Sequence, residues 1–413
     1  MFLPVLFAVC LAPASPQSIP IGPKPNVRAI TAFMNIDRAR YQMDIAETVK
    51  LLRTAQQTFQ GHGYTVQTLR IVTQPFAEYT KGLSREEALR FFKNLDGIAE
   101  QEHVLVSIGP AYISGDDGEA QADLLADVLR STRFLNGTVS VTTGDSVDWS
   151  AVKAAARVIK ILSEETPSSE GNFRFAAIAE MPAYSPFFPA AYHTGAGRQF
   201  TVGLESANTV IVAFQAAPGD PVSARRRLSE LFFHQMFDIE DVARTIDRDQ
   251  SWTYLGLDLS PAPGKEASIG AAIESLSGQP FGAPGTLTAV GTLTAALKDI
   301  GARKVGYSGV MLPIFEDPRL ALRWESGLVS LDSLMSYSAV CGTGLDGVPL
   351  PGDTSVETLA RIIGDVATLA VKWNKPLSAR LLPIAGKHAG DRTEFTDSRL
   401  VNLTLQPIAS GAH

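Results

Sequence analysis

The sequence predicts an α/β protein, in which strands alternate with helices and most strands run parallel. Apolar strand patterns alternate with amphipathic helix patterns as far as residue 166. The 413 residues are 45% hydrophobic and 19% charged, enough to bury a large core. Residues typical of helix ends lie between the segments. We expect strands at 27–36, 65–73, 103–108 and 138–143, and helices at 43–61, 84–100, 120–132 and 150–165.

The ends of the expected helices carry recognisable signals. Ser84 and Glu87 have the spacing of a capping box, which predicts that a helix begins at Ser84. Gly61 and Gly63 end the preceding helix, because glycine readily adopts the backbone conformation of a C-cap. The order of strands and helices therefore agrees with the local chemistry of the chain.

Beyond Pro167, Gly and Pro separate the apolar segments. These segments lie at 173–179, 199–204, 210–216, 252–257, 305–313 and 336–340. Polar or Gly-rich turns lie at 258–263, 281–286, 313–317 and 341–354. Loops at strand ends are where α/β proteins usually place functional residues, so these turns are the first places to search for a site.

Charge and hydropathy exclude two classes of protein. The formal net charge is −7, and the longest basic run is Arg225-Arg226-Arg227, which the helical spacing of 223–233 places on a solvated helix face. The sequence therefore predicts no nucleic-acid partner. Past the N-terminus no run reaches about 18 apolar residues, which predicts no integral membrane segment after processing. The composition leaves the oligomeric state open, a homo-oligomer included.

The first residues of the chain resemble a secretory signal peptide. Residues 2–12 form an apolar run, and Ala12-Pro13-Ala14 fits a small-x-small cleavage site. The missing Lys or Arg before the run counts against this assignment, and the bulky Val9 counts against lipidation of Cys10. We expect a signal peptide at 1–18, a Pro-rich linker at 19–26 and a single domain at 27–409. The protein would be exported to the periplasm or the medium, and cytoplasmic if the signal is not cleaved.

Removal of a signal peptide would leave Cys341 as the lone cysteine, so no intrachain disulfide is expected. Gly342 and Gly344 would allow a sharp turn that presents the sulfur or backbone N–H groups to a ligand. Asp346 and Asp353 follow, but carboxylates raise the pKa of a thiol, so activation would need a base or a metal ion from elsewhere. The alternative is a buried structural cysteine. The expected ligand contacts of this loop are Gly342, Thr343, Gly344 and Thr354.

A second candidate is His193, which ends the aromatic and Pro-rich segment 186–193. Such a segment suits the wall of a pocket that holds one titratable group. A histidine in a surface loop is the equally simple alternative. The absence of H-x-x-x-H and C-x-x-C motifs argues against a structural zinc site.

A third group of candidates is acidic. Glu205, Asp258 and the pair Glu316-Asp317 each follow an expected strand. If these strands share one edge of a sheet, the carboxylates would converge for acid–base chemistry, substrate binding or binding of a hard metal ion. Capping and turn formation explain Asp258 and Asp317 equally well.

Several of these segments together resemble domain-of-unknown-function family 711, over about residues 27–409. They are 28–31, 258–263, 281–286, 308–317 and, most specifically, the Cys-Gly-Thr-Gly-Leu-Asp and Pro-Gly-Asp-Thr pieces of 341–354. The resemblance implies a fold similar to the pyruvate formate-lyase-like enzymes. That fold is a ten-stranded α/β barrel of two parallel halves, with helices outside and an inner finger loop that would carry Cys341.

The sequence departs from the glycyl-radical enzymes of that fold. Lys304-Val305-Gly306-Tyr307 superficially resembles their radical motif, but it precedes the cysteine, and no such motif follows Cys341. Export would also separate the protein from a cytosolic activating partner. Both departures argue against glycyl-radical chemistry, and we expect residues 304–307 to belong to a strand.

These observations lead to three hypotheses. The first is an enzyme or small-molecule-binding pocket with Cys341, Asp346, Asp353 and His193 as its reactive groups. The second is a non-catalytic ligand-binding or structural barrel in which the cysteine is buried. The third is a metal-dependent hydrolase that uses Glu205, Asp258, Glu316 and Asp317. The sequence identifies neither the reaction nor the substrate nor a cofactor.

Overall fold

The computed structural model describes residues 22–112, 118–264 and 267–408. The expected signal peptide at 1–18, including Cys10, lies outside these residues. Within the described ranges, no helix has the length and apolar character needed to cross a membrane.

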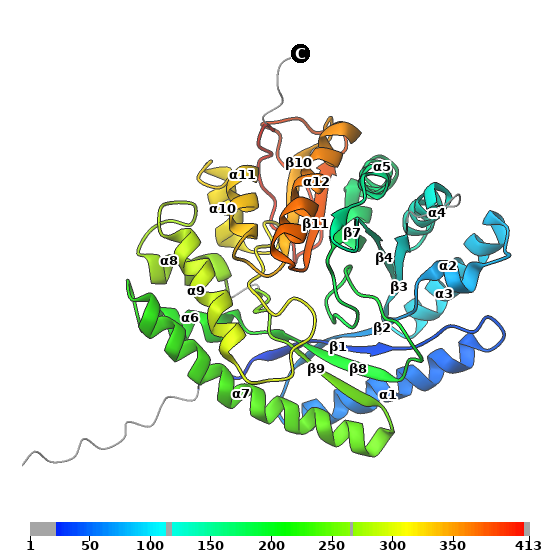
Figure 1. Ribbon diagram of the computed structural model, residues 1–413, viewed down its shortest axis with the longest axis horizontal. Helices are drawn as coiled ribbons and strands as arrows, with labels where there is room; N and C mark the ends of the chain where they lie inside the picture. Colours follow the sequence, from blue (N-terminus) through cyan, green and yellow to red (C-terminus); the bar gives the residue numbers. More distant parts are fainter. Residues whose placement is uncertain (1–21, 113–117, 265–266, 409–413) are drawn as a thin grey trace, which may run out of the picture.

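A mixed sheet of nine strands forms the centre of the protein (Figure 1). In spatial order the strands are β10 (Gly344–Pro351), β11 (Leu377–Ile384), β7 (Phe175–Ala179), β4 (Leu135–Ser140), β3 (Leu105–Tyr112), β2 (Val66–Val72), β1 (Asn26–Phe33), β8 (Gln199–Glu205) and β9 (Thr253–Asp258). The five from β7 to β1 are parallel to one another. The pairs β8–β9 and β10–β11 flank them, each pair internally parallel but opposite in direction to the five. The expected α/β class is confirmed. A short hairpin, β5 (Thr142–Thr143) and β6 (Ser146–Val147), stands apart from this sheet.

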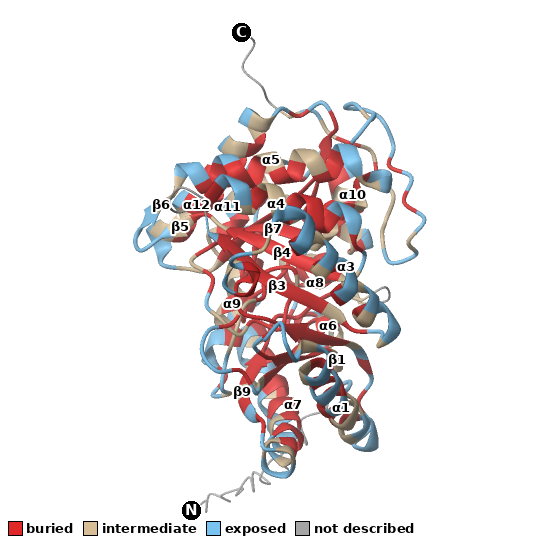
Figure 2. Cartoon of the chain, turned by 90° about the vertical axis from the view of Figure 1, so that its right-hand side faces the viewer, coloured by how far each residue is buried: buried red, intermediate tan, exposed pale blue. Residues whose placement is uncertain are grey.

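Helices cover the outer side of the sheet (Figure 1). They are α1 (Tyr41–Gly61), α2 (Phe76–Thr80), α3 (Arg85–Gln101), α4 (Gly118–Ser131), α5 (Trp149–Glu165), α6 (Ala207–Gln215), α7 (Pro221–Gln250), α8 (Ile269–Ser277), α9 (Thr286–Asp299), α10 (Pro318–Glu325), α11 (Leu331–Ser338) and α12 (Val356–Trp373), with a 3-10 segment at Pro167–Arg174. The strands are almost entirely buried, and exposed residues lie mainly on the outer helix faces (Figure 2).

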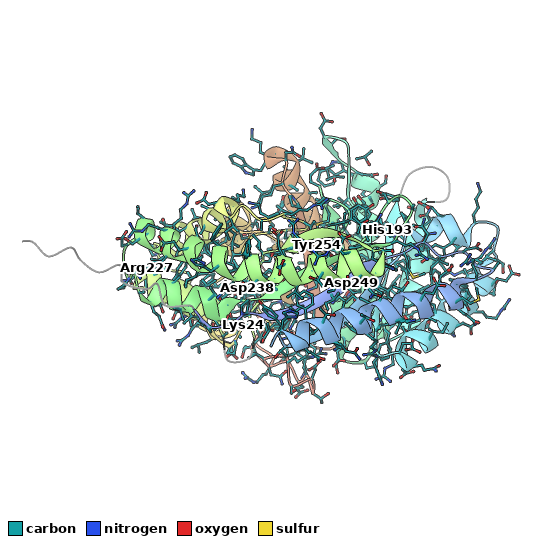
Figure 3. All side chains as sticks on the ribbon, turned by 90° about the horizontal axis from the view of Figure 1, so that it is seen from below. Lys24, His193, Arg227, Asp238, Asp249 and Tyr254 are labelled. Atoms are coloured by element: carbon teal, nitrogen blue, oxygen red, sulfur yellow. The ribbon has the colours of Figure 1, made fainter. Side chains whose placement is uncertain are left out.

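Local signals place several helices where the sequence predicts them. Ser84 and Glu87 form both hydrogen bonds of the expected capping box at the start of α3. The basic run begins at Arg225 and lies exposed on α7, as expected of a solvated face. α7 and α1 lie side by side along one face, where Arg227 and Asp238 mark the course of α7 (Figure 3).

Two predictions about the second half were wrong in their secondary structure. Most of the expected loop at 341–354 is strand β10, although its sequence holds two Gly and two Pro residues. An edge strand tolerates proline because one of its sides needs no ladder hydrogen bonds. Residues 305–313 form no strand, although Lys304 makes an isolated parallel bridge to Leu257 of β9. The apolar segments 210–216 and 336–340, for which the sequence predicted no particular secondary structure, belong largely to helices α6 and α11.

Two connecting segments, 180–198 and 303–317, run over the inner side of the sheet (Figure 1). The carbonyl of Pro186 accepts a hydrogen bond from Thr31 of β1, at 3.2 Å, and the carbonyl of Ala191 accepts one from Ser107 of β3, at 2.6 Å. The second segment contacts the sheet near the edge strand β10. There the carbonyl of Val310 accepts the N–H of Gly342, just before β10, at 2.8 Å. We call these the inner segments, and the space between them and the strands holds the candidate site.

Candidate functional site

A cavity of about 720 Å³ lies between the strands and the inner segments. Its charged lining is strongly basic, although the whole chain has a net charge of −7. Among the described residues that line it are seven arginines and four carboxylates: Arg28, Arg70, Arg130, Arg133, Arg174, Arg380, Arg399, Glu170, Glu316, Asp346 and Asp397. Arg130 and Arg133 also pair with carboxylates outside the lining, whereas Arg70 and Arg174 form no ion pair with a described carboxylate. Guanidinium groups without a carboxylate partner in a recess favour anionic ligands.

Three of these arginines come from the middle of apolar strands. Arg28 lies on β1, Arg70 on β2 and Arg380 on β11. Because successive side chains of a strand point to opposite faces, the apolar neighbours of each arginine pack under the helices while the arginine points toward the cavity. The sheet therefore places guanidinium groups from distant parts of the chain around one space.

Arg380 joins two carboxylates that arrive from different segments. Its Nη2 donates to Glu316 Oε1 at 2.6 Å and to Asp346 Oδ1 at 2.7 Å. Arg28 approaches the other oxygen of Glu316 at 3.5 Å and Glu205 at 3.4 Å. The structure thus brings together three of the residues that the sequence predicts, Glu205, Glu316 and Asp346, through arginines that connect them.

Arg70 has no carboxylate partner among the described residues. Its side chain is 6% exposed, its Nη1 donates to the Pro186 carbonyl at 2.9 Å and its Nε to Thr68 at 3.1 Å. The guanidinium lies 4.9 Å from the centre of the Phe188 ring. Burial, with repulsion from Arg28 and Arg380, lowers the pKa of Arg70 to about 9, although the nearby Glu316 acts in the opposite direction. The group therefore stays charged at neutral pH.

Asp346 projects from an irregularity in β10. The register of β10 against β11 shifts between Leu345 and Val348, and Gly347 has a left-handed φ of 60°. Bulges of this kind redirect side chains and occur often beside functional sites. The strand is therefore bent where the carboxylate enters the cavity.

The two carboxylates on Arg380 differ in their acidity. Burial raises the pKa of Asp346, and Glu316 adds to this effect, although Arg380 opposes it. Burial would also raise the pKa of Glu316, but Arg380 and Arg28 lower it overall. Neighbouring carboxyl groups whose pKa values are separated in this way are suited to acid–base chemistry.

Part of the cavity wall is apolar. Phe187, Ala262 and Met311 form a small buried cluster, against which the ring of Tyr307 packs. Burial raises the pKa of the Tyr307 hydroxyl, so this group is neutral at physiological pH. A ligand in the cavity would therefore meet charged groups and a separate apolar surface.

Cys341 is fully buried and is not among the described residues that line the cavity. Its Sγ accepts the N–H of Gly344 at 3.4 Å. Gly342 is explained by packing, because a Cβ there would lie 2.4 Å from the backbone of Gly309. Burial lowers the pKa of Lys375, and the nearby Cys341 acts in the opposite direction, so this lysine is a cation within electrostatic reach of the thiol. The role of Cys341 as a nucleophile stays a prediction.

The burial of Cys341 gives an expected result for thiol reactivity. We expect iodoacetamide to modify Cys341 only when the protein unfolds, because the sulfur is enclosed and bonded in the native fold. The measurement is mass spectrometry of the alkylated protein with and without denaturant. Complete modification of the native protein would instead support a reactive cysteine.

The other residues of the cysteine loop have different surroundings. Thr343 lines the cavity, and its carbonyl accepts the N–H of Ser378 at 2.8 Å. The Thr354 hydroxyl donates to the Pro351 carbonyl at 2.6 Å within the turn after β10. Asp353 is exposed and pairs with His388 at 2.9 Å, so the structure does not bring it to the cavity.

His193 is buried against the inner side of the sheet. One ring nitrogen contacts the Met34 carbonyl at 2.7 Å and the other the Thr194 carbonyl at 3.3 Å. Burial lowers the pKa of His193, which favours the neutral ring. His193 is not among the described residues that line the cavity with Asp346, and both ring nitrogens already contact the backbone.

Asp258 and Asp317 each bind backbone N–H groups, and they do not form one acidic centre. Asp258 accepts the N–H groups of Tyr307 at 2.8 Å and Ser308 at 2.9 Å, which fixes an inner segment to the end of β9. Burial raises the pKa of Asp258 to about 6. Asp317 caps α10 and also binds the N–H of Ile269 at 2.7 Å. Within the described ranges, no three His, Cys, Asp or Glu side chains gather as a metal site would require.

Sequence reasoning missed the arginines as site residues. Arg28, Arg70 and Arg380 each interrupt a run of apolar residues in an expected or observed strand. Arginine is rarely buried without a partner or a ligand, so an arginine inside a buried strand is the signal that identifies them.

The fold and the cavity define an α/β protein with an arginine-lined cavity on the inner side of its sheet. Comparison with known sequences adds the family. The model of the family described as "Uncharacterised ACR (DUF711)" matches residues 23–398. The chain belongs to this family.

Several relatives are named UPF0210 proteins. One from Pyrobaculum islandicum is 32% identical over 401 residues, which cover 89% of this chain and 86% of the relative. One from Desulforudis audaxviator is 29% identical, with 84% and 80% covered, and one from Neisseria meningitidis is 26% identical, with 88% and 83% covered. Their names state no activity.

Proposed function

We propose that the protein binds a small organic anion in this cavity and that Arg70 receives its acid group. The observation that carries the proposal is the buried Arg70, which forms no ion pair with a described carboxylate, in a lining that holds more arginines than carboxylates. A buried guanidinium loses its hydration, and an anionic ligand compensates this loss with charge-assisted hydrogen bonds.

The same cavity has the groups of an enzyme that moves protons. Asp346 lies beside Arg380 and within electrostatic reach of Tyr307, and a carboxyl group whose pKa is raised by burial is suited to proton transfer. We therefore favour an enzyme that acts on an organic acid over a purely structural role for the cavity.

We also propose that the second inner segment completes a ten-stranded barrel similar to that of the pyruvate formate-lyase-like proteins. Three contacts support this proposal. Leu257 of β9 donates to Arg303 at 2.8 Å, Gly342 donates to Val310 at 2.8 Å, and Ile314 donates to Asp346 of β10 at 3.3 Å. The segment thus has backbone contacts on both sides, toward β9 and toward the start of β10.

Matched ligands of different charge test the binding proposal. We expect hexanoate, by isothermal titration calorimetry, to bind at least about tenfold more tightly than hexanamide, which has the same carbon skeleton but no charge. Added salt should weaken the binding of hexanoate only. Equal affinities for the two compounds, or no binding of hexanoate, succinate or inorganic phosphate, would refute the proposed function.

A further inference from the structure

Several polar atoms of the cavity lining lack a hydrogen-bond partner among the described residues. Two of them, Arg380 Nε and Thr343 Oγ1, are fully buried. Two more belong to charged side chains that can meet a ligand. One is Nη2 of Arg70, whose Nη1 and Nε bind Pro186 and Thr68. The other is Oδ2 of Asp346, whose Oδ1 binds Arg380. One is a donor with a positive charge, and the other is an acceptor.

Arg380 and Glu316 are already paired, although Nε of Arg380 has no partner of its own. Arg380 Nη2 binds both carboxylates, and both oxygens of Glu316 have arginine partners. A ligand that binds without breaking these pairs meets Arg70 on β2 and Asp346 on β10. These strands lie far apart in the sheet order, so the ligand must reach across the cavity.

The apolar cluster of Phe187, Ala262 and Met311 contributes to the same lining. A chain of methylene groups would bury apolar surface there at about 25 cal/mol per Å². A ligand made only of polar groups would leave this surface without a complementary partner.

We propose that the ligand is a hydroxycarboxylic acid with an apolar spacer, whose carboxylate binds Arg70 and whose hydroxyl donates to Asp346. This inference rests on the proposed function, because it assumes that Arg70 holds an acid group. A hydroxyl fits better than an ammonium group, since the lining holds more arginines than carboxylates and an ammonium group would be repelled by Arg380 beside Asp346.

A series of ligands of increasing length tests the proposal. The probes are 4-hydroxybutanoate, 6-hydroxyhexanoate and 8-hydroxyoctanoate, each compared by calorimetry with the parent acid that lacks the hydroxyl. We expect one length to show a preference of at least about tenfold for the hydroxy acid, the gain of a hydrogen bond to a charged acceptor. No preference at any length, or tighter binding of 6-aminohexanoate than of 6-hydroxyhexanoate, would overturn the inference.

Two variants test whether Asp346 causes the preference for the hydroxy acid over its parent acid. Asp346→Ala should bind the hydroxy acid and its parent equally, while Asp346→Asn, which keeps an acceptor oxygen but not the charge, should retain only part of the preference. Binding of the parent acid shows that each variant is folded. An unchanged preference in Asp346→Ala overturns this inference and leaves the anion site standing, whereas loss of all carboxylate binding in the wild type refutes the proposed function.

Discussion

Replacing Arg70 by Met should weaken the binding of hexanoate by about 2 kcal/mol, roughly 30-fold, and leave the weak binding of hexanamide unchanged. The reason is that Met keeps the apolar stem but removes the charge and the donors that meet a carboxylate. Isothermal titration calorimetry of both compounds measures the effect. Arg70→Lys should lie between the wild type and the Met variant, because lysine keeps the charge but cannot form two parallel hydrogen bonds.

Arg226→Met is a matched control for the Arg70 experiment. Arg226 is exposed on α7, so its loss changes the net charge of the protein by the same amount without touching the cavity. Similar weakening in both variants would mean that long-range charge explains the effect, and Arg70 would not be the anchor. The Pro186 carbonyl also loses a donor in Arg70→Met, so unfolding by urea must show that the variant is folded at the temperature used.

Gly306→Ala should be one of the most destabilising single substitutions in the inner segments, with a loss of at least about 3 kcal/mol in the free energy of unfolding. Gly306 has a φ of 62°, and a Cβ there would lie 2.2 Å from Asp258 Oδ2. The methyl group would push away the carboxylate that holds Tyr307 and Ser308. The midpoint of urea unfolding measures the loss, provided that the slope of the transition is unchanged.

Gly278→Ala is a control that measures backbone strain without the steric clash expected between a Cβ at position 306 and Asp258. Gly278 has a similar φ of 66°, but nothing lies within 4 Å of the position of its Cβ. Its substitution should therefore cost only about 1 kcal/mol, the usual penalty for alanine in a left-handed conformation. Equal losses in the two variants would show that the contact with Asp258 contributes nothing.

The first half of the fold was predictable because its signals are local. The capping box of Ser84 and the periodicity of α1 depend on residues close in sequence. The second half was harder, because β10 is a strand rich in Gly and Pro that only its pairing with β11 explains. Residues 305–313 have strand-like composition, but Asp258 binds the N–H groups of Tyr307 and Ser308 and holds the segment in an irregular path.

The candidate site was predictable only in its acidic part. Glu205, Glu316 and Asp346 follow or interrupt apolar segments and were recognisable as candidates. Their partners Arg28 and Arg380 were not, because the pairing of arginine with carboxylate depends on which strands the sheet brings together. The sequence could identify charged residues within apolar segments, but it could not show which of them lie in contact in the folded protein.

The ion pair between Arg28 and Glu316 joins residues that are 288 positions apart. Contacts of such long sequence separation form late in folding, because the chain must first lose the entropy of closing the loop between them. The cavity therefore exists only after strands from both ends of the chain have assembled. Binding of an anion would report that the whole chain has folded, and a ligand present during refolding would stabilise only the completed protein.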